Sequence, residues 1–126
     1  MACLSAVAVL FCLTGVAFAQ NMPVSKPTIV SLDEGADQYV LGLVPRAQIL
    51  AVSDHARLPD SYFRDRAVGL RTIKPHLETL LALHPDMVVR TWGGDIKLLQ
   101  KLEDNHIKII NINDLNNLAQ ARHELL

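Results

Sequence analysis

Residues Val68–Gly94, which read VGLRTIKPHLETLLALHPDMVVRTWGG, decide the fold of this chain. The pattern predicts an irregular polar loop, an amphipathic helix near Pro75–His84 with proline in its first turn, an apolar strand over Met87–Thr91, and a Gly-Gly turn. The loop before the helix and the loop after the strand then lie at the same end of a sheet. Open α/β folds bind their ligands at that end.

The rest of the chain continues the alternation of strand and helix. Asp95 is a suitable N-cap for a helix that ends near Asn105, and Ser61–Ala67 predicts one or two helical turns. Alternating strands and helices indicate an α/β fold with a Rossmann-like parallel sheet of about four strands flanked by helices. The other expected strands are Thr28–Leu32, Gln48–Val52 and Ile107–Ile112, and the other expected helices are Ala36–Leu43 and a last one from Asn113-Asp114 to the terminus.

The first 19 residues predict export. Ala2–Ala19 is almost wholly apolar, carries no charged side chain and ends in Ala-Phe-Ala, which fits a signal peptide cleaved after Ala19. A short membrane span is the alternative, but no basic residue follows the apolar run as it does in a stop-transfer anchor. Residues 20–27 are a polar lead-in. Both cysteines, Cys3 and Cys12, fall within the signal peptide, so we expect no disulfide, thiol catalysis or cysteine-zinc site in the mature domain.

The charge balance argues against nucleic acid as a partner. The chain has 12 basic and 13 acidic residues, a net charge of −1, and no block of like charges. The histidines are scattered without metal-ligand spacing, so we expect no metal site of the protein's own and no cofactor.

Several segments together resemble a known family. Ile29-Val-Ser-Leu-Asp33, the Val68-Gly69 loop, and Leu77–Val89, which reads LETLLALHPDMVV and is followed by Gly93-Gly94, are similar to the N-terminal lobe of certain periplasmic binding proteins. These are the substrate-binding components of ABC importers for cobalamin, ferric siderophores and haem. The resemblance implies a lobe over residues 28–113, the start of an inter-lobe helix over 114–126, and a second lobe that this sequence does not contain.

The resemblance also implies a function and partners. A monomeric, non-catalytic periplasmic protein would capture a metal chelate and deliver it to the inner-membrane permease. An iron-siderophore or cobalamin-type chelate is favoured over haem, which such proteins often coordinate through Tyr or His. Tyr39 falls within a predicted helix and Tyr62 beside a loop, so neither is a strong axial ligand.

Four residues are the candidate ligand contacts. Trp92, just past a strand end, is an aromatic wall for a ring-rich ligand or a lid on the lobe's own core. Arg71, with Lys74, lies in the loop that the family turns toward ligand, where a cation suits an anionic chelate. Asp54 belongs to the loop after the second strand. Arg90 faces the cleft or pairs with Asp95.

Two further residues have competing interpretations. The resemblance implies that Glu78, exposed on the outer surface of the lobe, pairs with arginines of the permease; a helix-surface glutamate that favours the helix dipole is the alternative. His55 is the one histidine positioned to reach the cleft, although a lone histidine in a polar loop is normally solvated. Asp33 and Glu34 follow the first strand, where the family also contacts ligand. We favour a structural role for both, as negative charges and a cap at the start of a helix.

Two other functions stay open. A truncated relic or adaptor would keep the permease-docking face without binding ligand tightly. A small flavodoxin-like or nucleotide-binding enzyme is the third reading, with Asp33-Glu34-Gly35 as its nearest feature. That loop lacks the glycines of a phosphate-binding turn, and neither a Walker sequence nor a G-x-S-x-G motif is present. We therefore expect that the chain is not an enzyme.

Overall fold

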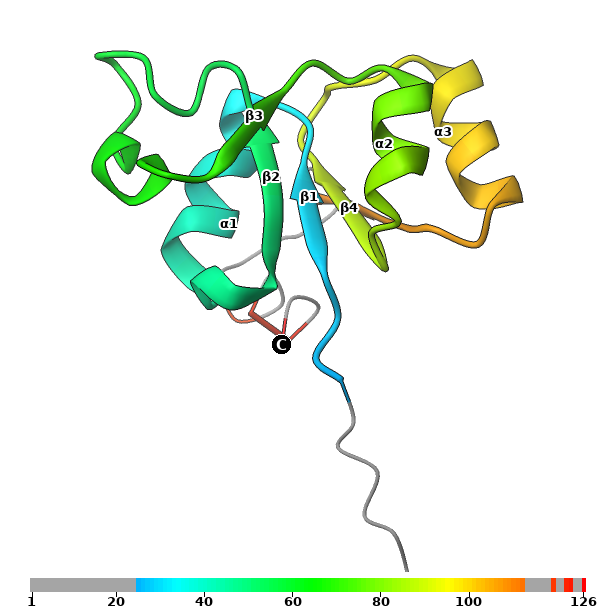
Figure 1. Ribbon diagram of the computed structural model, residues 1–126, viewed down its shortest axis with the longest axis horizontal. Helices are drawn as coiled ribbons and strands as arrows, with labels where there is room; N and C mark the ends of the chain where they lie inside the picture. The colour runs from blue at the N-terminus through cyan, green and yellow to red at the C-terminus, as the bar shows by residue number, and fades with distance from the viewer. Residues whose placement is uncertain (1–24, 113–118, 120–121, 124–125) are drawn as a thin grey trace, which may run out of the picture.

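The chain forms a five-stranded parallel sheet, shown in Figure 1. The structure is a computed structural model that describes residues 25–112, 119, 122, 123 and 126. The order across the sheet is β3-β2-β1-β4-β5, so the connection direction reverses between β1 and β4. The strands are β1 Ile29–Ser31, β2 Ile49–Ser53, β3 Arg71–Ile73, β4 Met87–Arg90 and β5 Lys108–Asn111.

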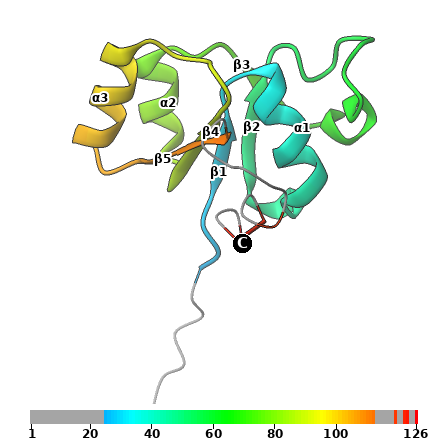
Figure 2. The same cartoon turned by 180° about the vertical axis from the view of Figure 1, so that it is seen from behind.

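Helices cover both faces of the sheet. Figures 1 and 2 show α1 (Glu34–Leu43) on one side and the neighbouring helices α2 (Leu77–Leu83) and α3 (Ile96–Asp104) on the other. Short 3-10 helices, η1 (Arg46–Gln48) and η2 (Arg64–Ala67), complete the described elements. This division of helices is what right-handed crossovers produce when the strand order reverses within the sheet.

Alternation along the strands supplies a core to each face. In β4, Met87 and Val89 pack with the α1 cluster, while Val88 packs with Leu80 of α2 and Leu102 of α3. All five of these side chains are buried. A strand buried on both faces reads as a continuous apolar run, which explains why MVV was recognisable in the sequence.

The sheet has one more strand than expected. The prediction of a polar loop over the residues after Val68 is wrong for Arg71–Ile73, which pairs in parallel with β2 as an edge strand. Only Ile73 of these three is buried, so two polar, exposed residues hid the strand pattern. Val68 and Gly69 precede β3 and therefore lie at the opposite end of the sheet from the expected ligand edge.

Arginine side chains hold the long connection between β2 and β3. Arg46 donates from its two Nη atoms to the carbonyls of Arg66 and Val68, at 2.8 and 2.6 Å. Arg57 donates to the carbonyls of Ala67 and Leu70. These guanidinium bonds tie η2 and the residues that follow it to η1 and to the loop after β2.

Some expectations concern residues outside this description. The predicted signal peptide lies wholly outside the described residues, as does most of the predicted segment 114–126. Among the described residues, no helix is both long and apolar enough to cross a membrane.

Candidate functional site

The connections that follow the strands gather at one edge of the sheet, the upper edge in Figure 1. This C-terminal edge carries Asp33 after β1, Asp54 after β2, Lys74 after β3 and Trp92 after β4. The β1–β4 boundary, where the strand order reverses, is the usual ligand crevice of an open α/β sheet. The four connections therefore define the candidate site, and its centre is the space between Asp33 and Trp92.

The carboxylate of Asp33 fills that crevice. Its Oδ2 accepts hydrogen bonds from the backbone N–H groups of Thr91, Trp92 and Gly93, at 2.8, 3.2 and 2.8 Å. Its Oδ1 accepts from the N–H of Ala36 at 2.9 Å, which is the expected helix cap, and from the hydroxyl of Thr91. A single buried side chain thus ties the start of α1 to the loop that carries Trp92.

Two glycines make this close approach feasible. A Cβ on Gly93 would lie 2.8 Å from Oδ2 of Asp33, and a Cβ on Gly35 would lie 2.5 Å from the hydroxyl oxygen of Thr91. Both positions therefore exclude larger residues. Gly94 has a φ of +86°, so it also meets the turn's backbone requirement. The Gly-Gly pair is turn geometry, as its sequence suggested, and the amide of Gly93 is occupied by Asp33.

Two buried carboxyl groups at this edge have opposite pKa shifts. Burial raises the pKa of Asp33, but hydrogen bonds from Thr91, Ala36 and Gly93 outweigh it and leave the pKa below 3.8. For Asp37 of α1, burial dominates and raises the pKa above 3.8, although Ser53 donates both its N–H and its hydroxyl to the carboxylate. Asp33 is therefore an anion in the fold, whereas Asp37 resists ionisation.

Trp92 projects from this edge into solvent. Its side chain is 69% exposed although its backbone is fixed by Asp33. With this exposure, Trp92 covers little of the lobe's own core. Ile96, at the start of α3, is also largely exposed. A large aromatic surface on a fixed loop is suited to stacking against a ring-rich ligand.

The other expected ligand contacts are only partly brought together. Asp54 is exposed at the C-terminal edge, and its side chain lies 3.9 Å from Nδ1 of the exposed His55. The predicted position of Arg71 is wrong. Arg71 is the first residue of the edge strand β3, level with Ala51, and does not lie in a loop at the ligand edge. Its contact with ligand stays a prediction.

Arg90 ends β4 two residues after the buried Val88. Its side chain therefore lies on the same face of the sheet as Val88, the face that α2 and α3 cover. Its Nε is buried without a hydrogen-bond partner among the described residues. Among the described residues, the pairs of oppositely charging side chains within 4.0 Å are His55 with Asp54 and Lys101 with Asp104. The expected alternative, a pairing of Arg90 with Asp95, is not found among those residues. Asp95 instead caps α3 by accepting from the N–H of Leu98 at 2.7 Å, as predicted.

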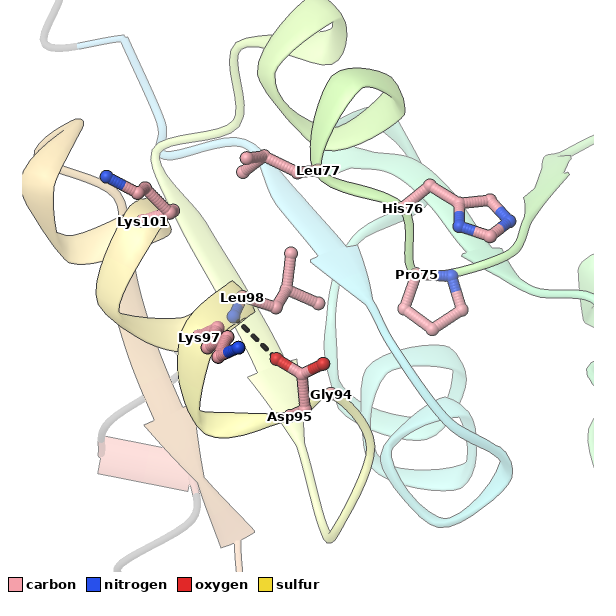
Figure 3. A pocket seen from close by; sticks show the side chains of 8 residues that line it. All are labelled: Pro75, His76, Leu77, Gly94, Asp95, Lys97, Leu98 and Lys101. Carbon is pink, nitrogen blue, oxygen red and sulfur yellow. Dashed lines mark hydrogen bonds between the residues drawn. The ribbon is translucent and has the colours of Figure 1, made fainter.

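Glu78 is exposed in the first turn of α2. Beside that turn lies a pocket of about 530 Å³ between α2 and α3. Figure 3 shows Leu77 and Leu98 on its two walls, with Lys97 and Lys101 along α3. The docking role of Glu78 stays a prediction, but its surroundings form an accessible surface of mixed charge. Among the described residues, no group of three or more His, Cys, Asp or Glu side chains could hold a metal ion.

Comparison with known proteins bears on the fold. No family model and no curated protein matches the sequence. Solved structures do match: a periplasmic haem-binding protein of Vibrio cholerae (24% identity, TM-score 0.54), a periplasmic vitamin B12-binding protein of the same organism (24%, 0.53), and a periplasmic haem-binding protein of Roseiflexus sp. RS-1 (20%, 0.55). The chain shares the α/β fold of one lobe of these binding proteins, as the sequence resemblance predicted.

The match covers most of this chain but a minor part of each of those proteins. It includes 69%, 68% and 67% of the chain, and 34%, 33% and 32% of the respective structures. The chain therefore spans about a third of the length of the proteins whose fold it shares.

Proposed function

We propose that the chain is the N-terminal lobe of a periplasmic solute-binding component of an ABC importer. It takes up a metal chelate of the iron-siderophore or cobalamin type and presents it to the membrane permease. The observation that carries this proposal is Trp92, an exposed aromatic side chain on a fixed backbone at the C-terminal edge of the sheet. The shared fold with periplasmic haem- and vitamin B12-binding proteins supports it.

The closed crevice determines how ligand meets the lobe. Nucleotide-binding α/β folds hold phosphate with free backbone amides at the switch point of the sheet. Here the amides of Trp92 and Gly93 already bind Asp33, and the buried carboxylate repels a second anion. This favours a non-enzymatic function over the flavodoxin-like reading. Ligand rests on the edge formed by Trp92 and neighbouring loops, without entering between β1 and β4.

An open edge of this kind provides one side of a binding site. The matched region of the chain covers about a third of each of these binding proteins. We therefore propose that the remaining contacts come from a second lobe, and that affinity for the chelate depends on both.

Ligand titration tests the proposal directly. The chain contains one tryptophan, so its fluorescence reports on Trp92 alone. Cyanocobalamin, ferrichrome and haem are the probes, with isothermal calorimetry as a second readout that is free of optical absorption by the ligand. We expect one probe to change the emission and to bind with a Kd of roughly 1–100 µM for a single lobe, weaker than a fully enclosed ligand.

Variants separate specific stacking from nonspecific adsorption. Trp92→Ala removes the aromatic surface and is expected to weaken calorimetric binding about tenfold. Val68→Ala is the matched control, because Val68 is an exposed apolar residue at the opposite end of the sheet. Equal weakening by both variants, or no binding of any of the three probes, rejects ligand capture by this chain.

A docking lobe without tight ligand binding is the second candidate. The exposed position of Glu78 and the partial coverage of the matched proteins favour it. In that case, the wild-type chain binds no probe but still competes with the intact importer's binding protein for the permease, and Glu78→Arg abolishes the competition.

A further inference from the structure

An apolar groove of about 550 Å³ runs along α1, on the face of the sheet opposite α2 and α3. Its side chains come from α1 and from the residue just before η2. The lining residues are Gly35, Gln38, Tyr39, Gly42, Leu43 and Phe63. The groove starts at Gly35, at the ligand edge, and follows α1 away from that edge; it lies on the face of the sheet opposite the helix that carries Glu78 (Figure 2).

Two of the α1 residues that line the groove are glycines, and the second of them packs against Phe63. Gly42 faces Phe63 so closely that a Cβ would lie 3.0 Å from its ring. Tyr39 and Leu43, one turn apart, form the other wall and are only partly buried against the α1 core. Partly covered aromatic and aliphatic walls, with a helix backbone as the floor, match the grooves that take up the apolar face of an amphipathic helix.

A cationic side chain lies beside Phe63 at the groove. The guanidinium of Arg66 lies 5.6 Å from the centre of the Phe63 ring and donates to the carbonyl of Gly42. It has no carboxylate within ion-pair distance among the described residues, whose ion pairs involve other side chains. The six lining residues include no acidic side chain. An occupant that adds a carboxylate near Arg66 therefore gains attraction without meeting repulsion from the lining.

We propose that this groove docks an acidic amphipathic helix of a partner protein. The apolar side chains of that helix lie between Phe63 and the wall formed by Tyr39 and Leu43, and a glutamate or aspartate of its polar face pairs with Arg66. This surface extends away from the ligand edge, so it acts independently of the proposed capture of a chelate.

The test uses two stapled helical peptides as probes. Both carry leucines three and four positions apart on one face; one has glutamates on its polar face and the other has lysines. Fluorescence anisotropy with the labelled peptides gives affinity, and amide chemical shifts locate the site on the full chain. The acidic peptide is expected to bind about tenfold more tightly than the basic one at low salt, with shifts confined to α1 and the residues around Phe63.

Three variants check each part of the groove. Tyr39→Ala is expected to weaken binding of the acidic peptide about fivefold or more. Arg66→Gln is expected to remove most of the difference in affinity between the two peptides. Lys97→Gln on α3 is the matched control and is expected to change neither affinity. Circular dichroism confirms that each variant is folded before its binding is interpreted.

Defined results overturn the proposal. Equal affinities for the two peptides contradict the proposed charge complementarity. Unchanged peptide binding by Tyr39→Ala contradicts the groove as the docking site. Sedimentation showing a dimer that Tyr39→Ala dissociates assigns the groove to a second copy of the chain. Loss of chelate binding leaves the docking of the helix unaffected, so the two proposals fail separately.

Discussion

Replacing Asp33 with asparagine tests the central contact of the site. The carboxylate accepts from four N–H groups or hydroxyls of the β4–α3 loop and from the N–H of Ala36 at the start of α1. Asparagine has one acceptor oxygen and a donor amide in place of two acceptors. Whichever way the amide is turned, its NH₂ group faces at least one backbone N–H, which is left without an acceptor.

The magnitude follows from those bonds. A hydrogen bond to a charged group contributes about 1.5–3 kcal/mol, and a buried donor left unpaired costs about 1–3 kcal/mol. With one of the two acceptor positions lost, we expect Asp33→Asn to lower the free energy of unfolding by about 3 kcal/mol. For a domain of this size, that corresponds to a fall in melting temperature of roughly 12–24 °C.

Urea unfolding followed by Trp92 fluorescence and by circular dichroism measures this loss. The matched control is Asp95→Asn, the same substitution at an exposed helix cap with a single bond to Leu98. Asparagine and aspartate cap helices about equally well, so the control is expected to change stability by less than about 0.5 kcal/mol. Similar losses for the two variants contradict the special role of Asp33.

The pH dependence supplies an independent check. The pKa of Asp33 is lowered in the fold, so its contribution is fully present above the unfolded value near 3.8 and is lost as pH falls through the folded pKa. The difference in the free energy of unfolding between wild type and Asp33→Asn should therefore stay constant from pH 7 to about 5 and narrow below pH 3.8. A difference in unfolding free energy that is under about 1 kcal/mol at pH 7, or that does not narrow as pH falls below 3.8, refutes the reasoning.

Four other variants have defined outcomes. Asp37→Asn should gain stability relative to wild type as pH rises, because the raised pKa of Asp37 means that its favourable protonated form is lost as pH rises through the folded value; unfolding curves at pH 4 and 8 measure this. Gly93→Ala should cost about 1–3 kcal/mol in urea unfolding, since its Cβ would meet Asp33 at 2.8 Å. Arg57→Leu should cost about 1–2 kcal/mol and speed amide exchange around residues 67–70, because Arg57 binds the carbonyls of Ala67 and Leu70. Glu78→Arg should reduce uptake of the chelate in cells while leaving its calorimetric affinity unchanged; equal uptake removes the docking role.

The sequence predicted the central strands and the helices that pack on them because those elements bury regular apolar patterns. Met87, Val88 and Val89 are buried on both faces of the sheet, and Asp95 caps α3 as its position before an amphipathic stretch predicts. Such patterns are local consequences of the period of a strand or helix. The caps and the parallel order followed from residues close to one another in the chain.

Edge and long-range features were beyond that kind of reasoning. The strand β3 has two exposed residues and one buried residue, so its sequence shows no apolar strand pattern. It is a strand because its backbone pairs with β2. Asp33 is a helix cap by sequence, but its bonds to Thr91, Trp92 and Gly93 span 58 to 60 residues. One signal was present: a buried carboxylate needs donors, and the Gly93-Gly94 turn offers amides that a side chain can approach.

The closed crevice links the fold to the function proposed for it. In an open α/β sheet, the switch point normally provides free amides for the ligand. Here the chain's own carboxylate occupies them, so the lobe gives up a local anion site and gains a rigid position for Trp92. Because the backbone of Trp92 is already fixed, only its side-chain rotations are restricted when ligand stacks on it, which lowers the entropic cost of binding. This arrangement suits a surface that is completed from outside, by a ligand and by a second lobe, and it predicts that Asp33→Asn weakens chelate binding even under conditions where the variant is fully folded.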